Sequence, residues 1–245
     1  MKAQRAKLEA HASHLLTAFI QLRERYSLLH PMLFTPHVPV QYGSYRQARG
    51  FAILKNSLFL SCCQDIAKLS TDKFEHTPSI KKLMAALQDD SLREQWRAEY
   101  CVDRIPCANP DHEPEVVEAL RSMAVEEVKR RRDEFDKKYI DALALWQTLS
   151  TSPALQGFRT IRDKVSAHTE VRFVDEEYQL VDISVLGVKW GDLKSTIAQM
   201  QELVELIGLL VRCSSFAWES LDQMLTKAGE DFWIAAPAIA ASAPE

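Results

Sequence analysis

The chain is poor in the residues that β-rich folds use for turns. Of its 245 residues only 7 are glycine and 10 are proline. Nearly every strand of a sheet must be followed by a turn, and Gly and Pro are prominent among turn residues. The shortage argues against a fold built mainly of strands and favours long helices.

Long apolar runs are also missing. The most apolar stretch, residues 203–211, is interrupted by Glu205 and is much shorter than the roughly 18 residues that read as a membrane span. The N-terminal residues lead into an amphipathic segment instead of the apolar core of a signal peptide. We therefore expect no membrane partner and a cytoplasmic location.

Cysteine is scarce and unpatterned. The five cysteines are an odd number without the spacing of a disulfide framework, which favours a reducing compartment. Cys101, Cys107 and His112 could be read as zinc ligands. Their spacing matches no standard zinc motif and a fourth ligand is not evident, so the sequence predicts no metal and no cofactor.

Positive charge does not dominate either. Lys and Arg number 30 against 34 Asp and Glu, which gives a formal net charge of −4 and argues against a general polyanion binder. The basic run at residues 129–132 is followed by Asp133 and Glu134. We interpret it as a solvated helix face with salt bridges, with an RNA-facing patch as the alternative. Arg131 falls on an apolar stripe, which predicts a pairing with a buried acid.

Helical periodicity is what the chain does have. Apolar residues at alternating steps of four and three predict a first helix ending before Pro31, and later segments repeat the pattern. Further helices are predicted over residues 45–69, 80–87, 92–100, 113–150, 153–168 and 192–227. We expect a loop over residues 31–42, an interruption over 105–114, and a short β-hairpin arm near 178–190.

These segments predict an all-α fold. We expect a helical bundle of six or seven helices forming a single domain over residues 1–230. Residues 231–245 are rich in Ala and Pro, and we expect them to be a disordered tail.

The most informative short stretch is Arg162-Asp163-Lys164-Val165-Ser166-Ala167-His168. On a regular helix Arg162 and His168 lie about 60° to either side of Val165, at the rim of the buried stripe. A guanidinium can clamp a phosphate, and an imidazole can move a proton near neutral pH. Two such helices around a twofold axis could bring both pairs into one cleft. The same spacing also arises by chance, and an interfacial Arg often only pairs a carboxylate.

Asp65 is a second polar residue close to a predicted apolar stripe. It lies between Cys62 and Leu69 on the helix over residues 45–69. We interpret it as a structural partner of Arg162 or Arg131, with an active-site role as the alternative. The other histidines are scattered without ligand spacing, and none is assigned a function.

The Arg162 element resembles the HEPN superfamily of all-helical proteins. That superfamily has an Arg, then four to six residues of which the first is polar, then a His; Arg162, Asp163 and His168 fit this pattern. The AbiU-type abortive-infection branch is the most similar. Its other elements match Lys68-Leu69 with Asp72, Ser79-Ile80-Lys81-Lys82-Leu83, and Ala167-His168. The resemblance covers roughly residues 45–225.

The resemblance implies a dimeric, metal-independent endoribonuclease of a bacterial defence or toxin–antitoxin system. It implies that His168 acts as general acid or base at the ribose 2′-hydroxyl and that Arg162 holds the scissile phosphate. Asp163 would orient one of them, and Lys164 would add affinity for the RNA substrate. The partners it implies are a second copy of the chain, RNA, and a cognate antitoxin or defence-complex protein.

One residue departs from a related pattern. HEPN toxins paired with nucleotidyltransferases often have Tyr two positions after the His, and this chain has Glu170 there. A carboxylate near the site and the low net charge favour a second hypothesis, a non-catalytic helical interaction or scaffold protein. An immunity factor or antitoxin is a third.

Overall fold

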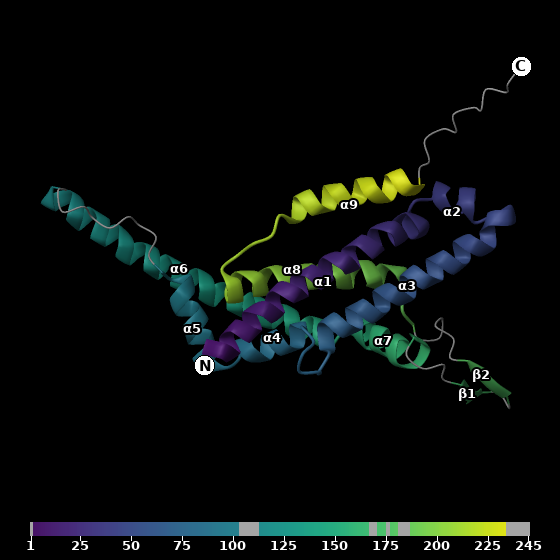
Figure 1. Ribbon diagram of the computed structural model, residues 1–245, viewed down its shortest axis with the longest axis horizontal. Coiled ribbons are helices and arrows are strands. Elements are labelled where there is room, and N and C mark those ends of the chain that lie inside the picture. The colour runs from purple at the N-terminus through teal and green to yellow at the C-terminus, as the bar shows by residue number, and fades with distance from the viewer. Residues whose placement is uncertain (1, 103–112, 167–170, 175–176, 181–186, 234–245) are drawn as a thin grey trace, which may run out of the picture. The chain divides into compact units, whose positions relative to one another are not determined.

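The computed structural model describes residues 2–102, 113–166, 171–174, 177–180 and 187–233. Its elements, in chain order (Figure 1), are α1 (Lys2–Phe34), α2 (His37–Tyr42), η1 (Tyr45–Gln47), α3 (Ala48–Thr71), α4 (Ile80–Leu87), α5 (Asp90–Tyr100), α6 (Pro114–Ser150), α7 (Pro153–Ile161), η2 (Arg162–Ser166), β1 (Val171–Val174), β2 (Glu177–Leu180), α8 (Trp190–Arg212) and α9 (Trp218–Trp233). The all-α prediction is confirmed. None of the helices described is long and apolar enough to cross a bilayer.

Three helices begin with a side-chain cap of the kind that the sequence suggests. Ser79, Asp89 and Ser152 accept hydrogen bonds from backbone N–H groups in the first turns of α4, α5 and α7. Pro153 follows as the first residue of α7, where its missing N–H costs no helical bond. These caps fix where each short helix starts.

The loop predicted over residues 31–42 is instead mostly helical. α1 continues through Pro31 to Phe34, and α2 follows after a short link. Pro31 lies in the last turns of α1, where the ring removes the bond to the Ser27 carbonyl but Thr35 N–H still donates to Pro31 O at 3.1 Å. The loss of one bond near a helix end does not stop the helix.

The helix predicted over residues 192–227 is two helices. α8 ends at Arg212 because Cys213 adopts a left-handed conformation with φ 51°, and α9 starts at Trp218. Ser214 N–H then donates to Gly208 O at 3.3 Å. This break and α2 raise the number of α-helices in the described residues to nine, against the six or seven predicted.

The hairpin lies earlier in the chain than predicted. β1 and β2 pair antiparallel, with Val171 opposite Leu180 and Val174 opposite Glu177. The β-branched and aromatic residues of β1 supply the first strand, which the sequence prediction had left outside the arm. Residues 181–186 of the predicted arm lie outside the described residues.

The chain divides into two compact units, each assembled from three segments. The first unit comprises residues 1–16, 71–150 and 201–216. In it Trp96 of α5 and Phe135 of α6 are buried, and the rings of Tyr100 and Phe135 meet edge to face at 5.6 Å. Arg93 stacks over the ring of Tyr139 at 4.7 Å, which ties α5 to α6 on the solvent side.

The second unit comprises residues 17–70, 151–200 and 217–245. The C-terminal half of α1, α3, α7 and α9 contribute buried residues to it, and Figure 1 shows α9 running beside α1. Trp233 anchors α9 there: its Nε1 donates to Leu28 O at 2.8 Å, and its ring packs on Tyr42 and Phe51. This unit carries Arg162, Asp163 and Lys164. The single domain predicted over residues 1–230 stays a prediction; residues 231–233 are helical, and residues 234–245 lie outside the described residues.

Candidate functional site

α7 is the element that positions Arg162. The cap at Ser152 fixes its start, and Leu155, Phe158 and Ile161 are fully buried along one face. This apolar face anchors the short helix through all of its turns. Arg162 follows Ile161 directly, so its backbone is held at the end of a well-packed element.

The backbone changes geometry at the candidate site. The chain leaves the α-helix after Ile161 and forms a π-helical turn over Arg162–Ser166. The regular helical wheel on which we placed Arg162, Val165 and His168 is therefore wrong for this turn. π turns are rare and frequently occur at functional sites, because the wider turn redirects side chains away from the helical pattern.

Arg162 and Asp163 form an ion pair on this turn. Arg162 Nε donates to Asp163 Oδ1 at 2.7 Å, with the side chains 30% and 54% exposed. An exposed pair of this kind contributes at most about 1 kcal/mol, so it does not lock the arginine. The pair engages Nε and does not involve the end-on edge that Nη1 and Nη2 form.

The other two predicted site residues are His168 and Lys164. His168 lies outside the described residues, and so does Glu170. Lys164 is half-buried on the π turn. The geometry of the predicted Arg–His pair therefore stays a prediction, while the Arg162–Asp163 contact is a finding.

Asp65 does not pair with either predicted arginine. Its Oδ2 accepts a hydrogen bond from Arg25 Nη1 of α1 at 2.7 Å. Burial raises the pKa of Asp65 above its ordinary value, and the Arg25 guanidinium opposes that rise. The sequence correctly placed Asp65 near the core of α3 but not its partner, because the contact joins residues that are far apart in the chain.

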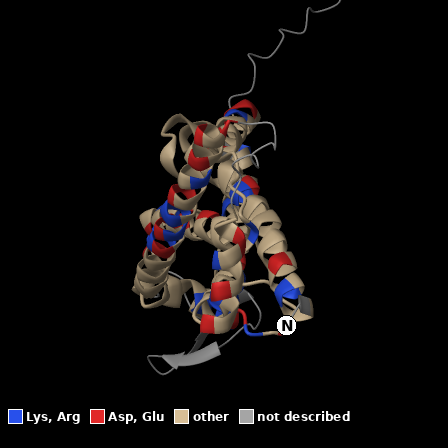
Figure 2. Ribbon diagram, turned by 90° about the vertical axis from the view of Figure 1, so that its left-hand side faces the viewer, with Lys and Arg blue, Asp and Glu red and all other residues tan. Residues whose placement is uncertain are grey.

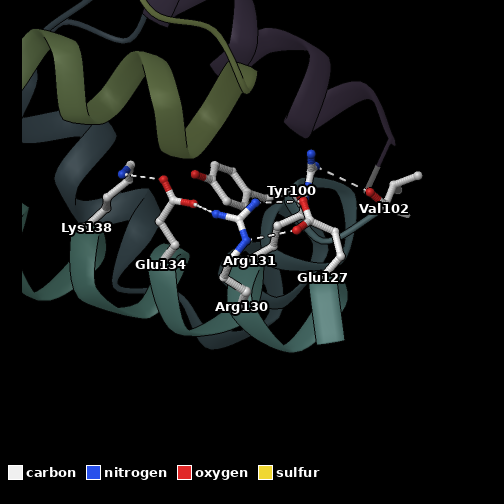
Figure 3. Close-up of polar contacts among 7 residues, drawn as sticks. All are labelled: Tyr100, Val102, Glu127, Arg130, Arg131, Glu134 and Lys138. Atoms are coloured by element: carbon white, nitrogen blue, oxygen red, sulfur yellow. Dashed lines mark hydrogen bonds and ion pairs between the residues drawn. The ribbon is translucent and has the colours of Figure 1, made fainter. Parts of the chain in front are cut away.

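Arg131 pairs with an acid of its own helix instead of a buried one (Figure 3). Its Nε donates to Glu127 Oε1 at 2.7 Å and its Nη1 donates to Tyr100 O at 3.2 Å. Arg130 shares Glu127, with its Nε 2.8 Å from Oε2, and approaches Glu134 at 3.7 Å. Arg131 thus caps the C-terminus of α5 by donating to the carbonyl oxygen of its last residue.

The basic run is therefore a salt-bridged helix face, as the sequence predicted, and Arg131, predicted to be the exception, joins it through Glu127. Figure 2 shows Lys and Arg positions interspersed with Asp and Glu positions along the helices. Such mixed patterning gives little long-range attraction for RNA. A nucleic-acid contact would have to be local.

The cysteines of α3 are core residues. Cys62 and Cys63 are both fully buried, and burial raises the pKa of Cys62 to about 12 and that of Cys63 further. Their thiols are protonated near neutral pH and are not nucleophiles. Across the described residues no group of three or more His, Cys, Asp or Glu is arranged to hold a metal ion.

Comparison with known proteins gives one match. The family model described as AbiU2, of the HEPN type, matches residues 5–232. No curated protein and no solved structure matches the chain significantly. The family match spans both compact units and includes every residue of the candidate site, and it confirms the resemblance seen in the sequence.

Proposed function

The chain belongs to the AbiU2 family of HEPN proteins, and we propose that it is a metal-independent endoribonuclease acting in the cytoplasm in bacterial abortive infection. The observation that carries the proposal is the position of Arg162. Arg162, the Arg of the Arg–His motif, lies on a π turn at the end of a helix that buries one face. Its guanidinium is partly exposed and donates a hydrogen bond through Nε to Asp163.

The geometry of the guanidinium suits a phosphate. Asp163 engages Nε, and no other hydrogen bond to Arg162 is found among the described residues, which leaves the Nη1 and Nη2 edge for a substrate. A planar guanidinium can hold two phosphate oxygens with parallel hydrogen bonds. In the proposed reaction this edge binds the scissile phosphate and stabilises the charge that grows on it.

His168 would supply the proton transfer. Its imidazole would take the proton from the ribose 2′-hydroxyl while that oxygen attacks the adjacent phosphorus. The bond to the 5′-oxygen of the next nucleotide breaks, and that oxygen takes up a proton. The products are a 2′,3′-cyclic phosphate and a 5′-hydroxyl. Lys164, on the same turn, would add affinity for the RNA backbone.

A dimer would complete the site. One chain offers one guanidinium and one imidazole within seven residues of sequence, and a second copy around a twofold axis would double both within one cleft. A cognate antitoxin or defence-complex protein would then restrain the nuclease.

The test is RNA cleavage by the purified full chain in the presence of EDTA. We expect cleavage with 2′,3′-cyclic phosphate ends, and a fall of about 1000-fold or more in Arg162→Ala and His168→Ala, since each removes a group that acts in the transition state. Arg121→Ala and His37→Ala are the matched controls, because both residues are exposed and belong to other helices, α6 and α2. Cleavage that persists in both site variants would refute the proposal.

A non-catalytic scaffold is the second candidate, and the Arg162–Asp163 pair favours it. A guanidinium already paired with a neighbouring carboxylate carries less net charge for RNA. The scaffold hypothesis expects no cleavage by the wild type under any of these conditions, together with a stable assembly by light scattering that Arg162→Ala leaves intact.

A further inference from the structure

A cavity lined by both polar and apolar side chains lies in the second compact unit, within residues 17–70, 151–200 and 217–245. Its volume is about 310 Å³, and α1, α8 and α9 line it. This volume is in the range of small-molecule sites. The lining residues that matter here are Arg23, His30, Lys194, Asp222, Thr226 and Glu230.

One charge pair in the lining is already satisfied. Arg23 Nη2 donates to Asp222 Oδ1 at 2.5 Å, which joins α1 to α9. The two opposite charges of this pair cancel, so the net charge of the cavity lining comes from other residues.

Besides the Tyr26 phenol, three further ionisable side chains line the same cavity, and no hydrogen bond or ion pair joins them. In the part of the chain that the structure describes, Lys194, His30 and Glu230 take part in no hydrogen bond or ion pair. Burial, and after it the charge of Lys194, lowers the pKa of His30, which places these two groups within electrostatic reach. The cavity thus offers a cation and an imidazole near each other, and a carboxylate as well.

His30 is held in place by rings on its own helix. Its imidazole lies 5.6 Å from the Tyr26 ring and 4.9 Å from the Phe34 ring, centre to centre. Residues at this spacing share one face of a helix. The imidazole is therefore an oriented hydrogen-bonding group.

The three groups restrict the ligand. A simple anion would be attracted by Lys194 and repelled by Glu230, and a simple cation would meet the reverse. A ligand that satisfies both must carry an anion at one end and hydrogen-bond donors at the other. We propose that the cavity binds a small phosphate ester of a polyol, with the phosphate on Lys194 and His30 and the hydroxyl groups on Glu230 and Thr226.

Each contact in this assignment has a physical reason. A phosphate monoester holds a second proton with a pKa of about 6, so it can share a proton with an imidazole, as a carboxylate cannot near neutral pH. Carboxylates are also the groups that proteins use to accept hydrogen bonds from ribose hydroxyls. The ligand could be a free sugar phosphate or the phosphorylated end of an RNA strand; the second source rests on the proposed ribonuclease function.

The experiment is isothermal titration calorimetry with the purified full chain. The probes are ribose 5-phosphate, ribose alone, inorganic phosphate and a 5′-phosphorylated oligoribonucleotide. We expect ribose 5-phosphate to bind and ribose alone not to bind. Tighter binding of the oligoribonucleotide than of ribose 5-phosphate would identify an RNA end as the source, and equal or weaker binding would identify the free sugar phosphate.

Paired variants separate the site from general charge. Lys194→Gln should weaken ribose 5-phosphate binding about tenfold or more, since it removes a charge-assisted contact, whereas Lys227→Gln should not. Glu230→Gln should weaken ribose 5-phosphate binding but leave inorganic phosphate bound equally or more tightly, and Asp231→Asn should change neither. Lys227 and Asp231 are exposed on α9 outside the cavity lining.

Three results would overturn the assignment. They are no binding of ribose 5-phosphate at about millimolar concentration, equal losses in Lys194→Gln and Lys227→Gln, and displacement of ribose 5-phosphate by glycine, which would show a zwitterion site. Unchanged thermal unfolding of each variant confirms its fold. Arg162→Ala should still bind ribose 5-phosphate. The binding assay therefore tests the cavity assignment, and the cleavage assay tests the nuclease proposal.

Discussion

Gly229 of α9 lies against the backbone carbonyl of Ser27 in α1. A Cβ atom at Gly229 would be 2.5 Å from Ser27 O, closer than any side chain can approach without movement. The normal helical partner of that carbonyl is the N–H four residues later, and residue 31 is a proline that has none. Pro31 therefore leaves a carbonyl uncovered, and Gly229 allows α9 to pack directly on it.

This contact predicts that Gly229→Ala destabilises the protein. The methyl group must displace backbone, so we expect a loss of about 1–3 kcal/mol in the free energy of unfolding. Gly50→Ala is the matched control, because an added Cβ there meets nothing within 4 Å in the exposed part of α3. It should raise stability by about 0.5–1 kcal/mol, as Ala favours a helix over Gly. Urea unfolding measures both; equal shifts in the two variants would contradict the close contact.

Lys82 holds the turn between α3 and α4. Its Nζ donates to the carbonyl oxygens of Phe74, Glu75 and Thr77 at 2.6, 2.8 and 2.7 Å. We expect Lys82→Met to lower stability by about 1–2 kcal/mol, because three charge-assisted bonds are lost in a partly exposed site. Limited proteolysis should cut near residues 72–79 faster in this variant. Lys81→Met, at an exposed neighbouring position, should leave both measurements unchanged.

The sequence predicted the helices and core more accurately than the breaks. The steps of four and three in α1 identify residues that are indeed buried, from Leu8 to Leu29, because a helix that buries one face has apolar residues at this spacing. The spacing of apolar residues does not show where α8 ends. It depends on a left-handed Cys213, a conformation that a non-Gly residue adopts only where the surrounding structure holds it.

The candidate site likewise has features that the sequence predicted and features that it did not. The sequence makes Arg162 and Asp163 candidates, since residue type and spacing carry the motif, and their role stays a prediction. It did not predict the π turn, which keeps the same residues but changes their directions. It also gave no signal for the cavity that contains His30, Lys194 and Glu230, because these come from three helices that are distant in sequence and no local pattern joins them.

Because His11 is buried, we expect the folded protein to lose stability in acid. It is 8% exposed, and burial, followed by the charges of Lys82 and Lys7, lowers its pKa below 6.5. The unfolded chain therefore binds this proton more readily than the folded one, so stability present above pH 6.5 is lost as the pH falls through the lower folded value. We expect the melting temperature of His11→Gln to fall less between pH 7.5 and about pH 5 than that of the wild type. His37→Gln, at an exposed position, should follow the wild type.

The Arg162–Asp163 pair makes the sharpest prediction about the proposed reaction. If the carboxylate orients the guanidinium through Nε, Asp163→Ala should lower kcat for RNA cleavage about tenfold, the loss expected for one charge-assisted hydrogen bond. KM should stay equal or fall, because a negative charge near the phosphate is removed. Asp163→Asn should recover part of kcat, since the amide oxygen can still accept from Nε. A variant that raised KM and left kcat unchanged would show Asp163 to be a ground-state binding residue, and the orienting role would then be wrong even if Arg162 itself proved essential.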